Sequence, residues 1–235
     1  MEHIKFKDLK NTNELIEAYS KSSFQARKIG EGAKLYKKEL NRGTTIIWSL
    51  AGSIFSAGLR ELVIDSVRKN LVDCLVCTGA LFEQDMLEAL GYNHYVQTEE
   101  IEDKTLQNLL IDRIYDHLLD EIELQHVDET YKKIAKQMDS GNYSSREFME
   151  YCGKWLSNVK DANDSVILAA YEMNVPIFIP AINDCSIGIG LAMNQSEVKN
   201  GISIDSIKDL REIAKMKDLC GDSGTVSYTH LRAHE

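Results

Sequence analysis

The 235-residue chain has 43% hydrophobic and 27% charged residues, which is the composition of a globular protein with enough apolar side chains for a core. Its formal net charge of −10 argues against a nucleic-acid partner, because an excess of carboxylates repels phosphates. The sequence shows no apolar run of membrane-spanning length and no secretory signal at its start, so we expect no membrane segment and a cytoplasmic location.

The first part of the chain predicts two helices. A polar stretch up to about residue 22 indicates a short helix and a connector. The next helix has apolar residues at helical spacing, and Ser22 and Ser23 offer hydroxyls for its N-cap. Asn41-Arg42-Gly43 is typical of a helix end, because glycine adopts the left-handed backbone of a C-cap without strain.

Residues 44–90 alternate between apolar and amphipathic runs, and we expect the rest of the chain to be organised around them. The predicted order is a strand at Thr44–Leu50, a helix at Gly52–Asn70, a strand that ends at Cys77 and a helix that ends near Leu90. Two such strands separated by a helix predict a βαβ unit with parallel strands. In its first helix we expect Leu59 and Leu62 on the buried face and Arg60 in water.

Both strands lead into turns of small residues, Ala51-Gly52-Ser53 and Thr78-Gly79-Ala80. In a parallel sheet these turns lie at the carboxyl edge, where helix N-termini offer bare N–H groups and a positive dipole end to a phosphate. The pattern is not the G-x-G-x-x-G fingerprint, so the motif itself is weak. The alternative interpretation is two tight turns whose small residues serve packing alone.

Residues 103–160 are predicted to be a helical insertion between parallel strands. Apolar residues recur in this segment at a spacing of four, at Leu106, Leu110, Ile114, Leu118 and Ile122. Further on, Ser144-x-x-Glu147 has the spacing of a capping box and predicts the start of another helix.

After the insertion the alternation of helices and strands resumes. The predicted elements are a helix at Asp164–Glu172, a strand at Val175–Ile179, a turn at Pro180–Asp184, a helix at Ser186–Met193, a strand at Gly201–Ile204 and a helix at Asp205–Lys217. We therefore expect one α/β domain over residues 1–223, with a mostly parallel sheet and helices on both faces. Residues 224–235 have neither periodicity nor a cap and look like foreign sequence; a genuine disordered tail is the alternative.

Five widely spread cysteines, an odd number, indicate reduced thiols. Cys74 and Cys77 form a C-x-x-C, but they fall within a predicted strand, where positions three apart point to opposite faces. We therefore expect neither a redox pair nor a bound metal.

Six segments, taken together and in this order, resemble the deoxyhypusine synthase family across about residues 22–193. They read SSFQARKIG, LAGSIFSAGLRELV, VDCLVCTGALFEQD, ALGYNHY, SREFMEYCGKW and VPIFIPAINDCSIGIGL. The resemblance implies a Rossmann-like fold that binds NAD. It further implies that the protein assembles as a homotetramer. It also implies transfer of the 4-aminobutyl group of spermidine to an acceptor amine, which is a lysine of a translation factor in the synthases and putrescine in homospermidine-forming relatives.

The resemblance also assigns site residues. Residues matched to NAD contacts are Gly52, Ser53, Ser56, Thr78, Gly79, Ala80 and Asp184. Glu83 matches a carboxylate at the polyamine end of the pocket, and Gln84 stands where the family has a second glutamate. Ile189 stands where eukaryotic synthases keep an aspartate, so two acids are replaced and the donor polyamine stays open.

Simpler structural roles remain open for several of these residues. Glu83 could be a first-turn acid that stabilises a helix N-terminus, and Asp184 could cap the helix that follows. His94 lies in a predicted loop, and we expect it on the surface.

Beyond the last predicted helix, Asp205–Lys217, members of the family continue with a Gly-Gly-Gly turn and a Trp-x-Lys segment that bears the catalytic lysine. The chain contains neither. We therefore expect a C-terminally incomplete copy without turnover, and we assign no catalytic residue. A non-catalytic NAD-binding module is one alternative. A sirtuin deacylase is disfavoured, because that class carries a four-cysteine zinc module.

Overall fold

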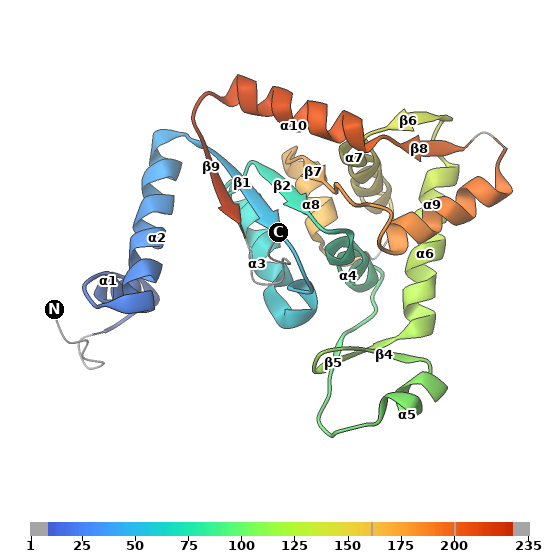
Figure 1. The fold of residues 1–235 in the computed structure, drawn as a ribbon, viewed down its shortest axis with the longest axis horizontal. Helices are drawn as coiled ribbons and strands as arrows, with labels where there is room; N and C mark the ends of the chain where they lie inside the picture. Colours follow the sequence, from blue (N-terminus) through green and yellow to red (C-terminus); the bar gives the residue numbers. More distant parts are fainter. Residues whose placement is uncertain (1–8, 161, 200, 228–235) are drawn as a thin grey trace. The chain divides into compact units, whose positions relative to one another are not determined.

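The computed structural model describes residues 9–160, 162–199 and 201–227 (Figure 1). The chain divides into two compact units, one with residues 1–45 and 222–224 and the other with residues 46–221 and 225–235. Among the residues described, no helix combines the length and apolar character needed to cross a bilayer.

The first unit contains two helices that pack on each other, α1 (Thr12–Ser20) and α2 (Phe24–Arg42). Asn11 caps α1, because its side chain accepts the N–H of Glu14 at 3.0 Å. Gly43 ends α2 as predicted, with a left-handed backbone at φ 70°.

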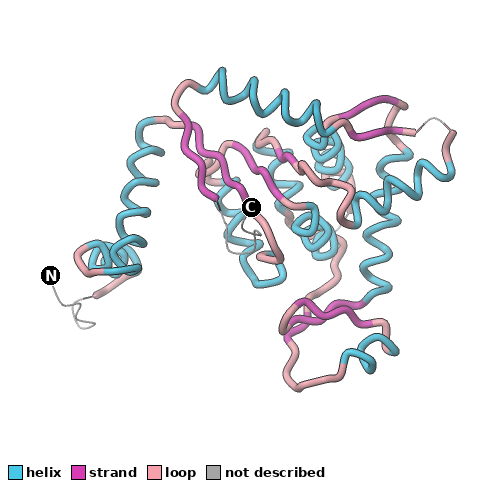
Figure 2. The backbone as a smooth tube through the Cα atoms, in the orientation of Figure 1, coloured by secondary structure: helices cyan, strands magenta, loops and turns pink. Residues whose placement is uncertain are grey.

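The main sheet has four strands in the order β7-β2-β1-β9 (Figure 2). They are β1 (Thr45–Leu50), β2 (Cys74–Cys77), β7 (Ile177–Phe178) and β9 (Ser223–Ser227). The pairings of β1 with β2 and of β2 with β7 are parallel. This confirms the predicted α/β class and the parallel arrangement.

The second unit contains most of the helices. They are α3 (Arg60–Arg68), α4 (Gly79–Ala89), α5 (Asp103–Asn108), α6 (Glu121–Lys136), α7 (Ser145–Leu156), α8 (Val166–Met173), α9 (Ser186–Glu197) and α10 (Ser206–Cys220). Buried aromatic rings join several of them: Phe55 meets Phe82 edge-on, and Tyr131 of α6 packs against Phe148 of α7. The Tyr131 hydroxyl also donates to the carbonyl of Phe82 at 2.8 Å, which fixes α6 against α4.

The predicted helix over residues 52–70 is interrupted. A π-helical turn, η2 (Phe55–Leu59), precedes α3, and Gly58 within it has φ 83°, a left-handed backbone that breaks the helical path. The prediction for the buried face was therefore wrong at three positions. Leu59 and Leu62 are 42% and 59% exposed, whereas Arg60 is only 5% exposed, because its guanidinium pairs with the buried Asp85.

The predicted helical insertion also needs correction over residues 110–120. A hairpin of β4 (Ile111–Ile114) and β5 (His117–Asp120), joined by β3 (Tyr95–Val96), forms an antiparallel sheet between α5 and α6 (Figure 1). Leu110 and Tyr115 have φ of 56° and 59°, so the chain leaves the helical region on both sides of β4. The recurrence of apolar residues at every fourth position predicted a helix and did not indicate this hairpin.

The remaining strands form a separate parallel pair of β6 (Gly141–Tyr143) and β8 (Ile202–Ile204). The capping box predicted from Ser144 and Glu147 is present at the start of α7 and is confirmed. Cys74 and Cys77 are buried, free thiols of β2, and the described residues contain no group of side chains suited to a metal. Residues 228–235 lie outside the described residues, so the proposed domain limit at 223 and the foreign tail stay predictions.

Candidate functional site

Two glycine-bearing bends lie at the same edge of the main sheet. Leu50 and Cys77 are the last paired residues of β1 and β2, and Thr78 N–H donates to the carbonyl of Leu50 at 3.2 Å. Each bend begins directly after its strand, as the βαβ pattern predicted. Gly52 in the first bend has φ 76°, a conformation that glycine adopts without strain.

The second bend brings the N-terminus of α4 against that of α9. A side chain added at Gly79 would place its Cβ 2.2 Å from Sγ of Cys185, so the approach of the two helices requires glycine here. Thr78 is the N-cap residue of α4, but its side chain makes no capping hydrogen bond. The first turn of α4 therefore keeps the unsatisfied character that favours an anion.

The first bend is tied to α4 by Gln84. The amide oxygen of Gln84 accepts the N–H of Ser56 at 3.1 Å, and both residues are buried. The Ser56 hydroxyl, which is also buried, has no hydrogen-bond partner within the part of the chain that the structure describes. Gln84 thus braces the first bend, and its predicted contact with a substrate stays a prediction.

Glu83 points to the start of α9, where its carboxylate accepts the N–H of Ser186 at 3.0 Å. Burial raises the pKa of Glu83, the hydrogen bonds from Ser186 oppose this rise, and the nearby charges of Asp128 and Asp184 add to it. The structure thus joins Glu83 and Asp184 electrostatically in one acidic neighbourhood.

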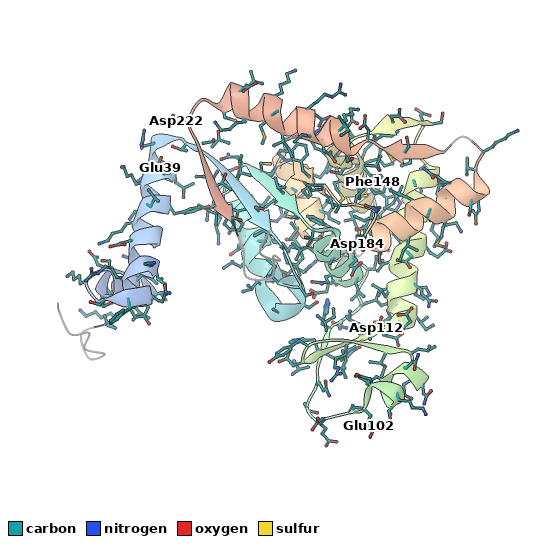
Figure 3. The ribbon with its side chains drawn as sticks, in the orientation of Figure 1. Glu39, Glu102, Asp112, Phe148, Asp184 and Asp222 are labelled. Carbon is teal, nitrogen blue, oxygen red and sulfur yellow. The ribbon has the colours of Figure 1, made fainter. Side chains whose placement is uncertain are left out.

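Asp184 itself is exposed at the end of the turn that follows β7 (Figure 3). The N-cap of α9 is Cys185, and the structure therefore contradicts the simpler interpretation of Asp184 as the helix cap. Ile189 is 50% exposed on the first turns of α9, so it offers an apolar surface where the family keeps an acid.

Sequence reasoning missed three further acids in this neighbourhood, Asp112 of β4 and Glu121 and Asp128 of α6. A hydrogen bond shared with Glu121, then burial and the charges of Glu121 and Glu83, raise the pKa of Asp112 to about 6. Burial also raises the pKa of Asp128, and a hydrogen bond from Ser186 opposes it. The signal was available as a run of acids in residues 112–128, but the helical interpretation of residues 103–160 hid it.

The fold is that of an α/β protein with paired bends at the carboxyl edge of a parallel sheet, beside a set of carboxylates. The sequence model described as deoxyhypusine synthase matches residues 14–227. The chain belongs to the deoxyhypusine synthase family.

Curated relatives agree with this assignment. The chain is 38% identical over 232 residues to a deoxyhypusine synthase-like protein of Elusimicrobium minutum, a match that covers 97% of this chain and 62% of that protein. It is 41% identical over 210 residues to one of Chlorobaculum parvum, covering 88% and 60%. The chain therefore spans about three-fifths of the length of these relatives.

A solved structure of a deoxyhypusine synthase candidate from Entamoeba histolytica has a similar fold. The TM-score is 0.64 at 19% sequence identity, and the match covers 97% of this chain and 80% of that one. At this identity the likeness shows the fold alone.

Proposed function

We propose that this region is the NAD-binding and polyamine-binding part of a transferase that moves the 4-aminobutyl group of spermidine to an acceptor amine. The observation that carries the proposal is the position of Glu83, next to the second bend and near Asp128 and Asp184, acids for which the described part of the chain shows no salt bridge. A di- or triammonium ligand would supply the missing positive charge.

The residues present fit a dinucleotide at the two bends. The unpartnered Ser56 hydroxyl offers a donor at the first bend, and the uncapped start of α4 offers N–H groups and a positive dipole end at the second. We assign the cofactor contacts to Gly52, Ser53, Ser56, Thr78, Gly79, Ala80 and Asp184. When bound, NAD would accept a hydride from the carbon next to the secondary amine of spermidine.

The chain's own residues would bind and orient the polyamine. Ser186 N–H holds the Glu83 carboxylate, which keeps lone pairs that can accept a hydrogen bond from an ammonium group. Gln84 keeps the first bend in place, and Asp184 adds negative charge near Glu83.

The acceptor divides the proposal in two. A lysine of a translation factor is the first candidate, and putrescine, as in homospermidine-forming relatives, is the second. Gln84, which is neutral and buried, and the exposed Ile189 both remove negative charge from the polyamine end, so they bear on the donor polyamine and not on the choice between the two acceptors. A homotetramer is implied in either case, and light scattering would check it.

Calorimetric titration of the purified chain with NAD and with spermidine tests the proposal. We expect both to bind, and we expect Glu83→Gln to weaken spermidine at least tenfold while NAD binding changes little. Glu102→Gln is the matched control, because it removes the same charge from an exposed position in the same unit. Equal affinity in both variants would remove Glu83 from the site, and absence of any NAD binding would refute the proposed function.

Turnover separates the two acceptors. Release of 1,3-diaminopropane from spermidine, measured with either putrescine or the translation factor present, identifies the acceptor in a full-length relative. The same measurement on this chain tests the expectation of no turnover.

A further inference from the structure

The strand β7 ends next to Ser145, a buried serine at the start of helix α7. β7 is at the edge of the sheet in the strand order, so none of the described strands pairs with the N–H groups on its outer side. Ile179, which follows β7 and is fully buried, donates its N–H to the hydroxyl oxygen of Ser145 at 2.7 Å. The serine thus satisfies a buried backbone group that the sheet leaves unpaired.

Ser145 is in turn held by α10. Its N–H donates to Oδ1 of Asp209 at 2.8 Å, and both residues are almost completely inaccessible to solvent. Ser145 is the first residue of α7, and Asp209 therefore satisfies a first-turn N–H from outside the helix. Burial raises the pKa of Asp209, and hydrogen bonds from Ser145 and Arg146 oppose the rise.

The residue that Ser145 fixes leads directly into the candidate site. Ile179 is followed by the turn over residues 180–184, and Asp184 ends this turn. The next residue, Cys185, packs against Gly79 at the second bend, and Ser186 N–H holds Glu83. Hydrogen bonds from Asp209 of α10 to Ile179, the backbone of residues 179–186 and the contacts of Cys185 and Ser186 therefore join Asp209 to Glu83 of α4.

We propose that Ser145 and Asp209 are positioning residues that hold the turn over residues 180–186, and with it Asp184 and Glu83, in the geometry that binds the polyamine. The inference rests on the proposed function for its ligand, but the anchoring of the turn can be tested without any ligand. Loss of the Ser145 hydroxyl leaves the Ile179 N–H buried and unsatisfied, which favours a shifted turn.

Ser145→Ala is the test and Ser144→Ala is its matched control. Both serines are fully buried at the start of α7, and both variants lose one hydroxyl. Ser144 makes its side-chain hydrogen bonds with Glu147 and Glu212 instead of with Ile179. Amide hydrogen exchange of residues 179–186, measured without ligand, reports the turn, and titration with spermidine reports the site.

We expect Ser145→Ala to speed exchange over residues 179–186 at least tenfold and to raise the Kd for spermidine about tenfold. Ser144→Ala should lower the melting temperature through its lost cap but leave both quantities within twofold. Asp209→Ala should give the same pattern as Ser145→Ala with a smaller exchange effect, because the Ser145 hydroxyl remains.

A double variant distinguishes positioning from general destabilisation. If Ser145 acts through Glu83, Ser145→Ala should weaken spermidine binding much less in a Glu83→Gln background than in the wild type. Equal effects in both backgrounds, or equal exchange in the Ser145 and Ser144 variants, would overturn the proposal. If the wild-type chain binds no spermidine, the proposed function fails and the exchange measurement alone decides whether Ser145 anchors the turn.

Discussion

Neighbouring acids of helix α4 lie in two regions of opposite electrostatic character. Asp85 is fully buried, lies 2.8 Å from the guanidinium of Arg60 and accepts the N–H groups of Val166 and Ile167. Glu83, two residues earlier, has acids as its charged neighbours. The difference separates structure from function: a carboxylate with a built-in cation holds helices together, whereas one among other acids is suited to a cation from outside.

In the region around Arg60, the acids Asp85 and Glu88 of α4 lie beside a positively charged side chain. Arg60 also lies 3.3 Å from Glu88, whose carboxylate contacts Nδ1 of His94 at 2.9 Å. Burial would raise the pKa of Glu88, but the hydrogen bond from His94 and the charge of Arg60 lower it overall. The His94 side chain is only 7% exposed, so the predicted surface position of this histidine was wrong.

The largest effect is expected when the region around Arg60 loses its cation. Arg60→Met keeps much of the volume but leaves the carboxylate of Asp85 buried without a counter-ion, which should lower the free energy of unfolding by about 3–5 kcal/mol. Urea denaturation measures this. Arg68→Met is the control, because Arg68 pairs with Asp164 and Glu172 on the surface and should cost less than about 1 kcal/mol. Similar losses in both variants would contradict the assigned role of Arg60.

A smaller effect is expected at Gly79, where the close contact between the N-termini of α4 and α9 supports both the region around Arg60 and the region around Glu83. Gly79→Ala places a Cβ 2.2 Å from Sγ of Cys185, so the N-termini of α4 and α9 must separate, at a cost of about 1–3 kcal/mol. Spermidine affinity should fall with stability, because the separation moves Ser186 away from Glu83. In contrast, Gly32→Ala in α2 meets nothing within 4 Å and should stabilise the chain slightly. Thermal unfolding of both variants tests the difference in sign.

The sequence predicted the parts of this comparison that depend on local pattern. The parallel strands, the two bends and the capping box at Ser144 follow from residues close together in the chain. Arg60 could not be placed in the same way, because its burial depends on a partner 25 residues away and on the break in the helix at Gly58. A guanidinium at a helical position reads as exposed until its partner is known.

The acidic neighbourhood shows the same limit. Glu83 and Asp184 were found through their match to a family motif, but Asp112 and Asp128 come from other elements of the fold. A spacing of four predicts a helix over residues 106–122, and only the backbone at Leu110 and Tyr115 turns this segment into a hairpin. Residues from three elements therefore meet in a way that periodicity does not encode.

The acidic surroundings of Glu83 predict a distinctive pH dependence of the free energy of unfolding. Because burial raises the pKa of folded Glu83 above its ordinary value of 4.5, the folded state holds this proton more tightly than the unfolded state. The contribution of Glu83 to stability is therefore lost as the pH rises above about 4.5. The Glu83→Gln variant should not show this decline of stability with pH, and the change in its free energy of unfolding should be smaller than that of Gly79→Ala. Spermidine should stabilise the wild type more than the variant at neutral pH. Urea midpoints from pH 4 to 8 measure both, and a decline that persists in the variant would assign it elsewhere.

The smallest effect is expected at Asp112, where water screens the interaction. A hydrogen bond with Glu121 and the surrounding negative charge raise the pKa of Asp112 from 3.8 to about 6. A carboxylate with a raised folded pKa loses its contribution to stability as the pH rises through the interval between these values. Asp112→Asn should flatten the stability profile between pH 3.8 and about 6, by less than about 1 kcal/mol because the residue is exposed. NMR titration of the Asp112 carboxyl checks the cause directly. A midpoint near 4 would show that Asp112 is independent of Glu121 and Glu83, whereas a midpoint near 6 that falls in Glu121→Gln would show that Glu121 raises the pKa of Asp112.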